Sequence, residues 1–95
     1  MTTVYKKTEH VATRRVGGET ILVPISGRLA DLEKVYVLNE VGEYIWEQLD
    51  GSRDVRHISA GVADEFDADG LREHDECLAF VRELVREGLI TEVRS

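Results

Sequence analysis

The sequence predicts a small α+β domain of winged helix-turn-helix-like type, in which a three-stranded antiparallel sheet is followed by three helices. Strand-like runs rich in β-branched residues fill the first third of the chain, whereas apolar residues recur every three or four positions in the rest. Neither a small sheet nor short helices can bury an apolar face alone, so we expect both parts to share one core. The 95 residues form one domain, 1–95, whose residues 1–9 are expected to be flexible.

The first two expected strands form a hairpin. Val11–Val16 and Glu19–Val23 are strand-like, and Gly17-Gly18 between them can adopt the positive φ angles of a two-residue turn. Pro24 cannot donate a ladder hydrogen bond, so it marks an edge or the end of the second strand. A loop is then expected over residues 25–33.

Lys34–Leu38 is predicted as the third strand. Its alternation would place Val35 and Val37 on one face, and Tyr36 and Leu38 on the other. A sheet of three strands exposes unpaired backbone donors and acceptors on at least one side, and an extended peptide can pair with such an edge.

Apolar spacing and capping residues predict the first two helices. Asn39 is a good N-cap for the first, whose apolar residues recur every four positions until Asp50-Gly51, where glycine can take the left-handed C-terminal position. Ser52 or Asp54 caps the second helix, which ends before Asp67.

The third helix is expected over Arg72–Glu87, with Gly88 ending it and an extended segment over residues 89–93. Its continuous apolar stripe comprises Cys77, Leu78, Val81, Leu84 and Val85.

Charge is distributed unevenly along the chain. The net charge is −7, yet residues 1–35 carry six basic and four acidic side chains and the remaining residues six basic and fifteen acidic ones. The acidic part disfavours nonspecific nucleic-acid binding, because release of counterions requires a cationic surface. The basic first third leads to the hypothesis that a partner is acidic.

Composition also indicates the compartment. The single cysteine excludes an internal disulfide and fits a reducing environment. No apolar run approaches the roughly 20 residues of a membrane-spanning helix, and the N-terminus lacks a signal peptide pattern. We therefore expect a cytoplasmic protein without membrane contact.

Catalytic and metal motifs are weak. His74 and Cys77 are neighbours on the third helix, but Cys77 belongs to the apolar stripe and nothing supplies an orienting group or an oxyanion site. Asp67, Asp69 and Glu76 approximate a calcium loop, although its first position is occupied by Glu65. The sequence therefore predicts no enzyme activity, no cofactor and no metal site.

A winged helix-turn-helix also suggests DNA binding as an alternative function. The third helix would then enter the major groove, but it carries three arginines against five carboxylates. Phosphates would repel such a helix.

The segment Val37–Gly51, V-L-N-E-V-G-E-Y-I-W-E-Q-L-D-G, resembles the signature of PqqD-like proteins, as do the segments 54–58, 62–67 and 78–90. The resemblance implies a winged-helix-like peptide chaperone without catalytic activity. Such proteins bind the leader segment of a ribosomally synthesised precursor peptide by strand addition. They present it to a modifying enzyme, often a radical S-adenosylmethionine (SAM) protein.

The resemblance also implies which residues contact the peptide. The leader would pair with the third strand and lie against the third helix. The candidate strand residues are Lys34, Val35, Tyr36, Val37 and Leu38, and the candidate groove residues are Leu78, Val81, Arg82 and Val85. The apolar members of the second set can equally belong to the core, and the chain can be a monomer or a dimer.

Overall fold

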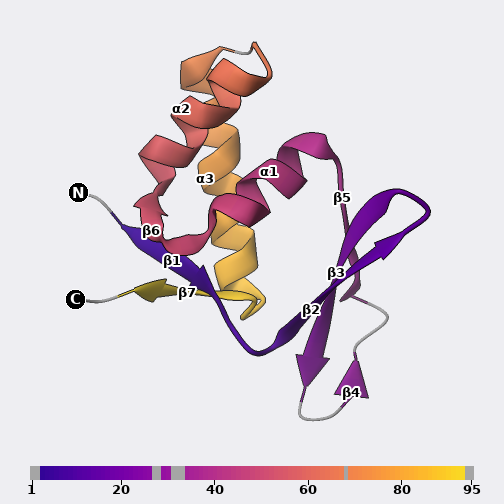
Figure 1. Cartoon of the computed structure of the whole chain (residues 1–95). Coiled ribbons are helices and arrows are strands. Elements are labelled where there is room, and N and C mark those ends of the chain that lie inside the picture. Colours follow the sequence, from indigo (N-terminus) through magenta and orange to yellow (C-terminus); the bar gives the residue numbers. More distant parts are fainter. Residues whose placement is uncertain (1–2, 27–28, 31–33, 68, 94–95) are drawn as a thin grey trace.

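The computed structural model describes residues 3–26, 29–30, 34–67 and 69–93, which form strands and helices of an α+β domain (Figure 1). The strands are β1 Val4–Lys7, β2 Val11–Val16, β3 Glu19–Ser26, β4 Leu29–Ala30, β5 Tyr36–Leu38, β6 Asp50–Asp54 and β7 Ile90–Val93. The helices are α1 Glu40–Gln48, α2 Val55–Glu65 and α3 Gly70–Arg86. The predicted fold class is confirmed.

β2 and β3 form the predicted hairpin. Gly17 and Gly18 connect them with φ angles of 57° and 84°, and Val16 pairs with Glu19 across the turn. β3 does not end at Pro24, however, but continues to Ser26. The backbone N–H of Ile25 donates to His10 O of the preceding segment at 2.8 Å, so the nitrogen of Pro24 faces the other side of β3. On that side β5 pairs only with residues 20–22 and β4 with residues 25–26, so Pro24 interrupts neither ladder.

The third strand is shorter than expected. β5 spans Tyr36–Leu38 and pairs antiparallel with β3, whereas Lys34 and Val35 lie outside the strand. Its faces are as predicted, because Leu38 is buried and Val37 is 61% exposed. The expected loop over 25–33 contains the end of β3 and the short β4; residues 27–28 and 31–33 lie outside the described part of the chain.

A second sheet, in the order β6-β1-β7, includes residues 4–7 of the segment 1–9 that the sequence suggested to be flexible. β1 is its central strand and pairs antiparallel with both neighbours. Tyr5 of β1 packs against the core, and Thr8 N–H donates to Leu89 O at 3.0 Å. These pairings join residues that are far apart in the chain, so the local pattern of residues 1–9 does not reveal them. β7 confirms the extended segment expected over 89–93 (Figure 1).

The predicted N-caps of the first two helices are confirmed. Asn39 Oδ1 accepts from Gly42 N–H at 2.8 Å to start α1, and Asp54 Oδ1 accepts from His57 N–H at 2.7 Å to start α2. The prediction that Gly51 ends α1 is wrong. The helix closes at Leu49, and Gly51 has its positive φ of 87° inside β6.

The end of α3 agrees with the sequence, while its start does not. The helix begins at Gly70 rather than Arg72. At the other end, Gly88 has a φ of 74°, and its N–H donates to Val85 O while Leu89 N–H donates to Leu84 O. These two bonds make a Schellman motif, which glycine favours because it has no Cβ.

The core lies where the three helices meet β3, β5 and the start of β7. Its buried apolar residues are Leu22, Leu38, Ile45, Trp46, Leu49, Val55, Ile58, Val62, Cys77, Val81, Leu84, Leu89 and Ile90. Among the described residues, no helix is long and apolar enough to cross a membrane.

Candidate functional site

One edge of β5 is open. β5 pairs with β3 on one side, and no strand among the described residues pairs with its other side. In β3 the N–H of Ile25 points to β2, so strand alternation turns even-numbered residues of β3 toward β5. Two of these residues, Thr20 and Leu22, pair with Leu38 and Tyr36. Tyr36 and Leu38 therefore point their backbone N–H and C=O groups at β3. The N–H and C=O of Val37 consequently point to the open edge.

The C-terminal half of α3 lies next to β5. Lys34 Nζ is 3.9 Å from Glu87 Oε1. Burial raises the pKa of Tyr36, and the carboxylates of Glu87 and Glu83 raise it further, against the opposing charge of Arg86. A strand added to β5 would thus run beside the acidic flank of α3.

The candidate groove residues of α3 differ in how far they are buried. Val81 is fully buried, so its side chain belongs to the core, whereas Leu78 is half-buried and Val85 is 41% exposed. Successive helix residues are rotated by about 100°, so Leu78, Arg82 and Val85 lie on one flank of α3 and Phe80, Glu83 and Glu87 on the other. β5 lies at the second flank. Direct contact of each predicted residue with a peptide stays a prediction.

Sequence reasoning missed the α3 residues that flank β5. Phe80 packs against the core, and Glu83 and Glu87 approach Tyr36. Their spacing of three, four and seven positions places them on one face of the helix, which a sequence can reveal. It does not reveal which flank of the apolar stripe meets the strand.

Four of the basic side chains of the first third lie away from the open edge, and Lys34 beside it is paired with Glu87. Lys6 and Lys7 lie on β1 and Arg14 and Arg15 on β2, and β3 separates β2 from β5. The hypothesis of an acidic partner therefore gains no support at β5. The DNA-binding alternative gains none either, because Glu83 and Glu87 line this side of α3.

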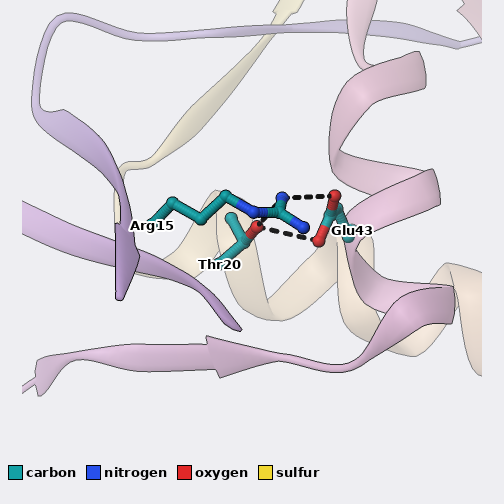
Figure 2. Close-up of polar contacts among 3 residues, drawn as sticks. All are labelled: Arg15, Thr20 and Glu43. Carbon is teal, nitrogen blue, oxygen red and sulfur yellow. Dashed lines mark hydrogen bonds and ion pairs between the residues drawn. The ribbon is translucent and has the colours of Figure 1, made fainter. Parts of the chain in front are cut away.

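A polar cluster holds the hairpin on α1 (Figure 2). Arg15 Nη1 donates to Thr20 Oγ1 at 3.1 Å and to Glu43 Oε1 at 3.0 Å, and Thr20 Oγ1 donates to Glu43 Oε2 at 2.8 Å. The hydrogen bond from Thr20 lowers the pKa of Glu43 most, followed by that from Arg15. Because Thr20 lies opposite Leu38, this cluster also orients β5.

Trp46 of the PqqD-like signature is a structural residue. It is buried, and its Nε1 donates to Thr13 Oγ1 at 3.3 Å. Lys7 Nζ lies 5.2 Å from the ring centroid, within the range of a cation–π contact, and burial lowers the pKa of Lys7. The tryptophan thus joins β1, β2 and α1.

The weak catalytic and calcium motifs do not assemble into sites. Cys77 is buried, and burial together with the charge of Glu73 raises its pKa to about 11, so it is a poor nucleophile. His74 Nδ1 instead lies 3.1 Å from Ser59 Oγ. Glu76 pairs with Arg72 at 3.1 Å, and no group of three metal-ligating side chains occurs in the described part of the chain.

Comparison with known proteins agrees with this geometry. The family model "Coenzyme PQQ synthesis protein D (PqqD)" matches residues 19–90. The solved structure "TbiB1 in Complex with the TbiA(beta) Leader Peptide" has the same fold, with a TM-score of 0.72 and 19% identity over 95% of this chain and 99% of that one. No curated protein matches. Since the family model spans most of the chain, from the start of β3 to the start of β7, this protein belongs to the PqqD family.

Proposed function

We propose that this protein is a non-catalytic peptide chaperone. It binds the leader segment of a ribosomally synthesised precursor peptide and presents it to a modifying enzyme, such as a radical SAM protein. The observation that carries this proposal is the open edge of β5, where Val37 turns its backbone N–H and C=O outward beside α3. The family membership and the leader peptide bound to TbiB1 support it.

The peptide joins the sheet as a strand next to β5. Its backbone pairs with Val37, while Lys34 and Val35 extend the contact along the segment that precedes the strand. Main-chain pairing of this kind gives affinity that depends little on sequence. It therefore needs a second element to select the peptide.

Selection comes from the flank of α3 that faces β5. Alternate side chains of an added strand point to one face of the sheet, where Tyr36, Phe80, Glu83 and Glu87 offer an apolar surface edged by carboxylates. Val81 supports this surface from the core, since it has no exposed area. Leu78, Arg82 and Val85 lie on the other flank and do not contact the strand in this arrangement.

The substitution Val37→Pro tests strand addition directly. Proline removes the outward N–H, which β3 does not use, so the fold is retained while pairing with a peptide is lost. Val37→Ala is the matched control, because it keeps the N–H and removes a side chain that is 61% exposed.

The measurement is isothermal titration with leader peptides of short precursors encoded beside this gene, with melting curves as a check of folding. We expect binding to V37P to weaken roughly tenfold or more, and binding to V37A to change little. A folded V37P protein that binds as well as V37A would show that the peptide does not add to β5. Absence of binding by the wild-type protein to every such leader would reject the proposed function.

A further inference from the structure

A hollow of about 390 Å³ lies on the flank of α3 that faces away from β5. Four elements contribute to its lining, namely β1, the end of β6, the start of α2 and α3. The residues that matter here are Tyr5, Asp54, Arg56, His74, Leu78 and Arg82. Nothing in the peptide-binding arrangement above uses this hollow, and it was not recognised from the sequence.

The lining of the hollow has a net positive charge, because Arg56 and Arg82 outnumber the one carboxylate among the lining residues, Asp54. Arg56 and Arg82 are exposed, and neither has a carboxylate within ion-pair distance among the described residues. Asp54 is the carboxylate in the lining, and it already accepts the N-capping hydrogen bond from His57 N–H at 2.7 Å. Two guanidinium groups are therefore available to an incoming carboxylate, which arginine can bind bidentately.

The remainder of the lining is partly apolar. Tyr5 and Leu78 are both half-buried and pack against the core, so they add a fixed, partly apolar surface to the lining that contains the two arginines. An occupant that combines carboxylates with aliphatic side chains would satisfy both parts of this lining.

We propose that this hollow is the docking site for an acidic, partly apolar segment of the modifying enzyme. This inference rests on the proposed function, because a presenting protein needs one surface for the peptide and another for the enzyme. The two surfaces lie on opposite flanks of α3, so both can be occupied at once. The unpaired arginines select an acidic segment by charge complementarity.

The test is a ¹H–¹⁵N NMR titration of the whole chain with the probe peptide acetyl-Val-Asp-Leu-Glu-amide. Its neutral analogue, acetyl-Val-Asn-Leu-Gln-amide, controls for apolar binding. The variant R56Q/R82Q removes both guanidinium groups. R14Q/R72Q is the matched control, since it makes the same change in net charge at two exposed arginines outside the hollow.

We expect the acidic probe to cause saturable shifts at the amides of Tyr5, Arg56, Leu78 and Arg82. The shifts persist in R14Q/R72Q, weaken at least tenfold in R56Q/R82Q and are absent with the neutral peptide. Equal shifts with both peptides, unchanged binding in R56Q/R82Q, shifts centred on Tyr36–Leu38, or no shifts would each overturn the proposal. Leader binding is measured separately at the amides of β5. Its absence rejects the proposed function, whereas its presence without acidic-probe binding rejects only this docking site.

Discussion

Gly61 of α2 lies in close contact with Tyr44 of α1. A Cβ atom built at this position would collide with Tyr44 Oη, and Tyr44 Cζ would lie 3.3 Å from it. The Tyr44 ring is itself held edge-on against Phe66, with 5.9 Å between the centroids and an angle of 84° between the planes. Tyr44 therefore cannot move away without losing this aromatic contact. Close packing, rather than an unusual φ angle, accounts for glycine inside this helix.

We expect Gly61→Ala to lower the free energy of unfolding by about 1–3 kcal/mol through overpacking. Alanine has the higher helix propensity, by about 1 kcal/mol, so packing and propensity oppose each other here. The free energy of unfolding, measured with denaturant, shows which of the two effects is larger. The double variant Y44F/G61A lacks the colliding hydroxyl and should recover part of the loss relative to Y44F alone. A G61A protein more stable than the wild type would mean that α1 and α2 are not in close contact at this point.

At the scale of elements, the Arg15–Thr20–Glu43 cluster couples the hairpin to α1 (Figure 2). Thr20 is 5% exposed, so its hydroxyl is removed from water on folding and needs the bond it makes to Glu43. The charged form of Glu43 accepts both hydrogen bonds, which is why its pKa is lowered in the folded protein. This part of the attachment of the sheet to the helix thus depends on the ionisation of one carboxyl group.

This dependence predicts how stability responds to acid. A carboxyl group with a lowered folded-state pKa contributes stability above its unfolded-state pKa, and the contribution is lost as the pH falls through the folded-state value. We expect wild-type protein to melt above Glu43→Gln at pH 7, and the difference to shrink steadily below about pH 4.5. Glu40→Gln, in the same first turn of α1, is the control. A gap between wild type and E43Q that is constant from pH 7 to pH 3 would contradict this account.

The elements differ in how far the sequence determines them. The helices were predictable because apolar spacing and caps such as Asn39 and Asp54 act within a few residues. β6 was not predictable, since Asp50–Asp54 is a polar segment that is extended because it pairs with β1. An open edge could be predicted without side-chain detail, because a sheet of three strands leaves backbone groups unpaired on at least one side.

Which residues of α3 belong to the site depends on long-range packing, and local sequence patterns do not reveal it. The apolar stripe of α3 indicated that one side is buried, and Val81 is accordingly in the core. Which flank of that stripe meets β5 depends on how the sheet packs against the helices, a long-range arrangement. The sequence therefore suggested Leu78, Arg82 and Val85, whereas Glu83 and Glu87 are the residues that approach Tyr36.

For the molecule as a whole, the two ends of the chain close the fold. β1 near the N-terminus lies between β6 and β7, and β7 near the C-terminus follows α3 directly (Figure 1). Thr8 strengthens this closure, because its hydroxyl donates to Gly88 O at 2.8 Å and its N–H to Leu89 O at 3.0 Å. The helices contact strands of both sheets, and α3 keeps one flank toward β5 and the other toward the hollow.

A proline in β1 tests whether this closure stabilises the protein. Lys6 is exposed but pairs with Thr91 on one side and Asp50 on the other, so its N–H is used by one of the two ladders. We expect Lys6→Pro to lower the free energy of unfolding by about 3 kcal/mol, and Lys6→Ala to change it by less than about 0.5 kcal/mol. The free energies of unfolding of K6P, K6A and V37P, measured with denaturant, show whether proline destabilises the central strand β1 more than the edge strand β5. If K6P were as stable as K6A, residues 4–7 would be as flexible as their local sequence suggested, and the N-terminal strand would have no part in positioning α3.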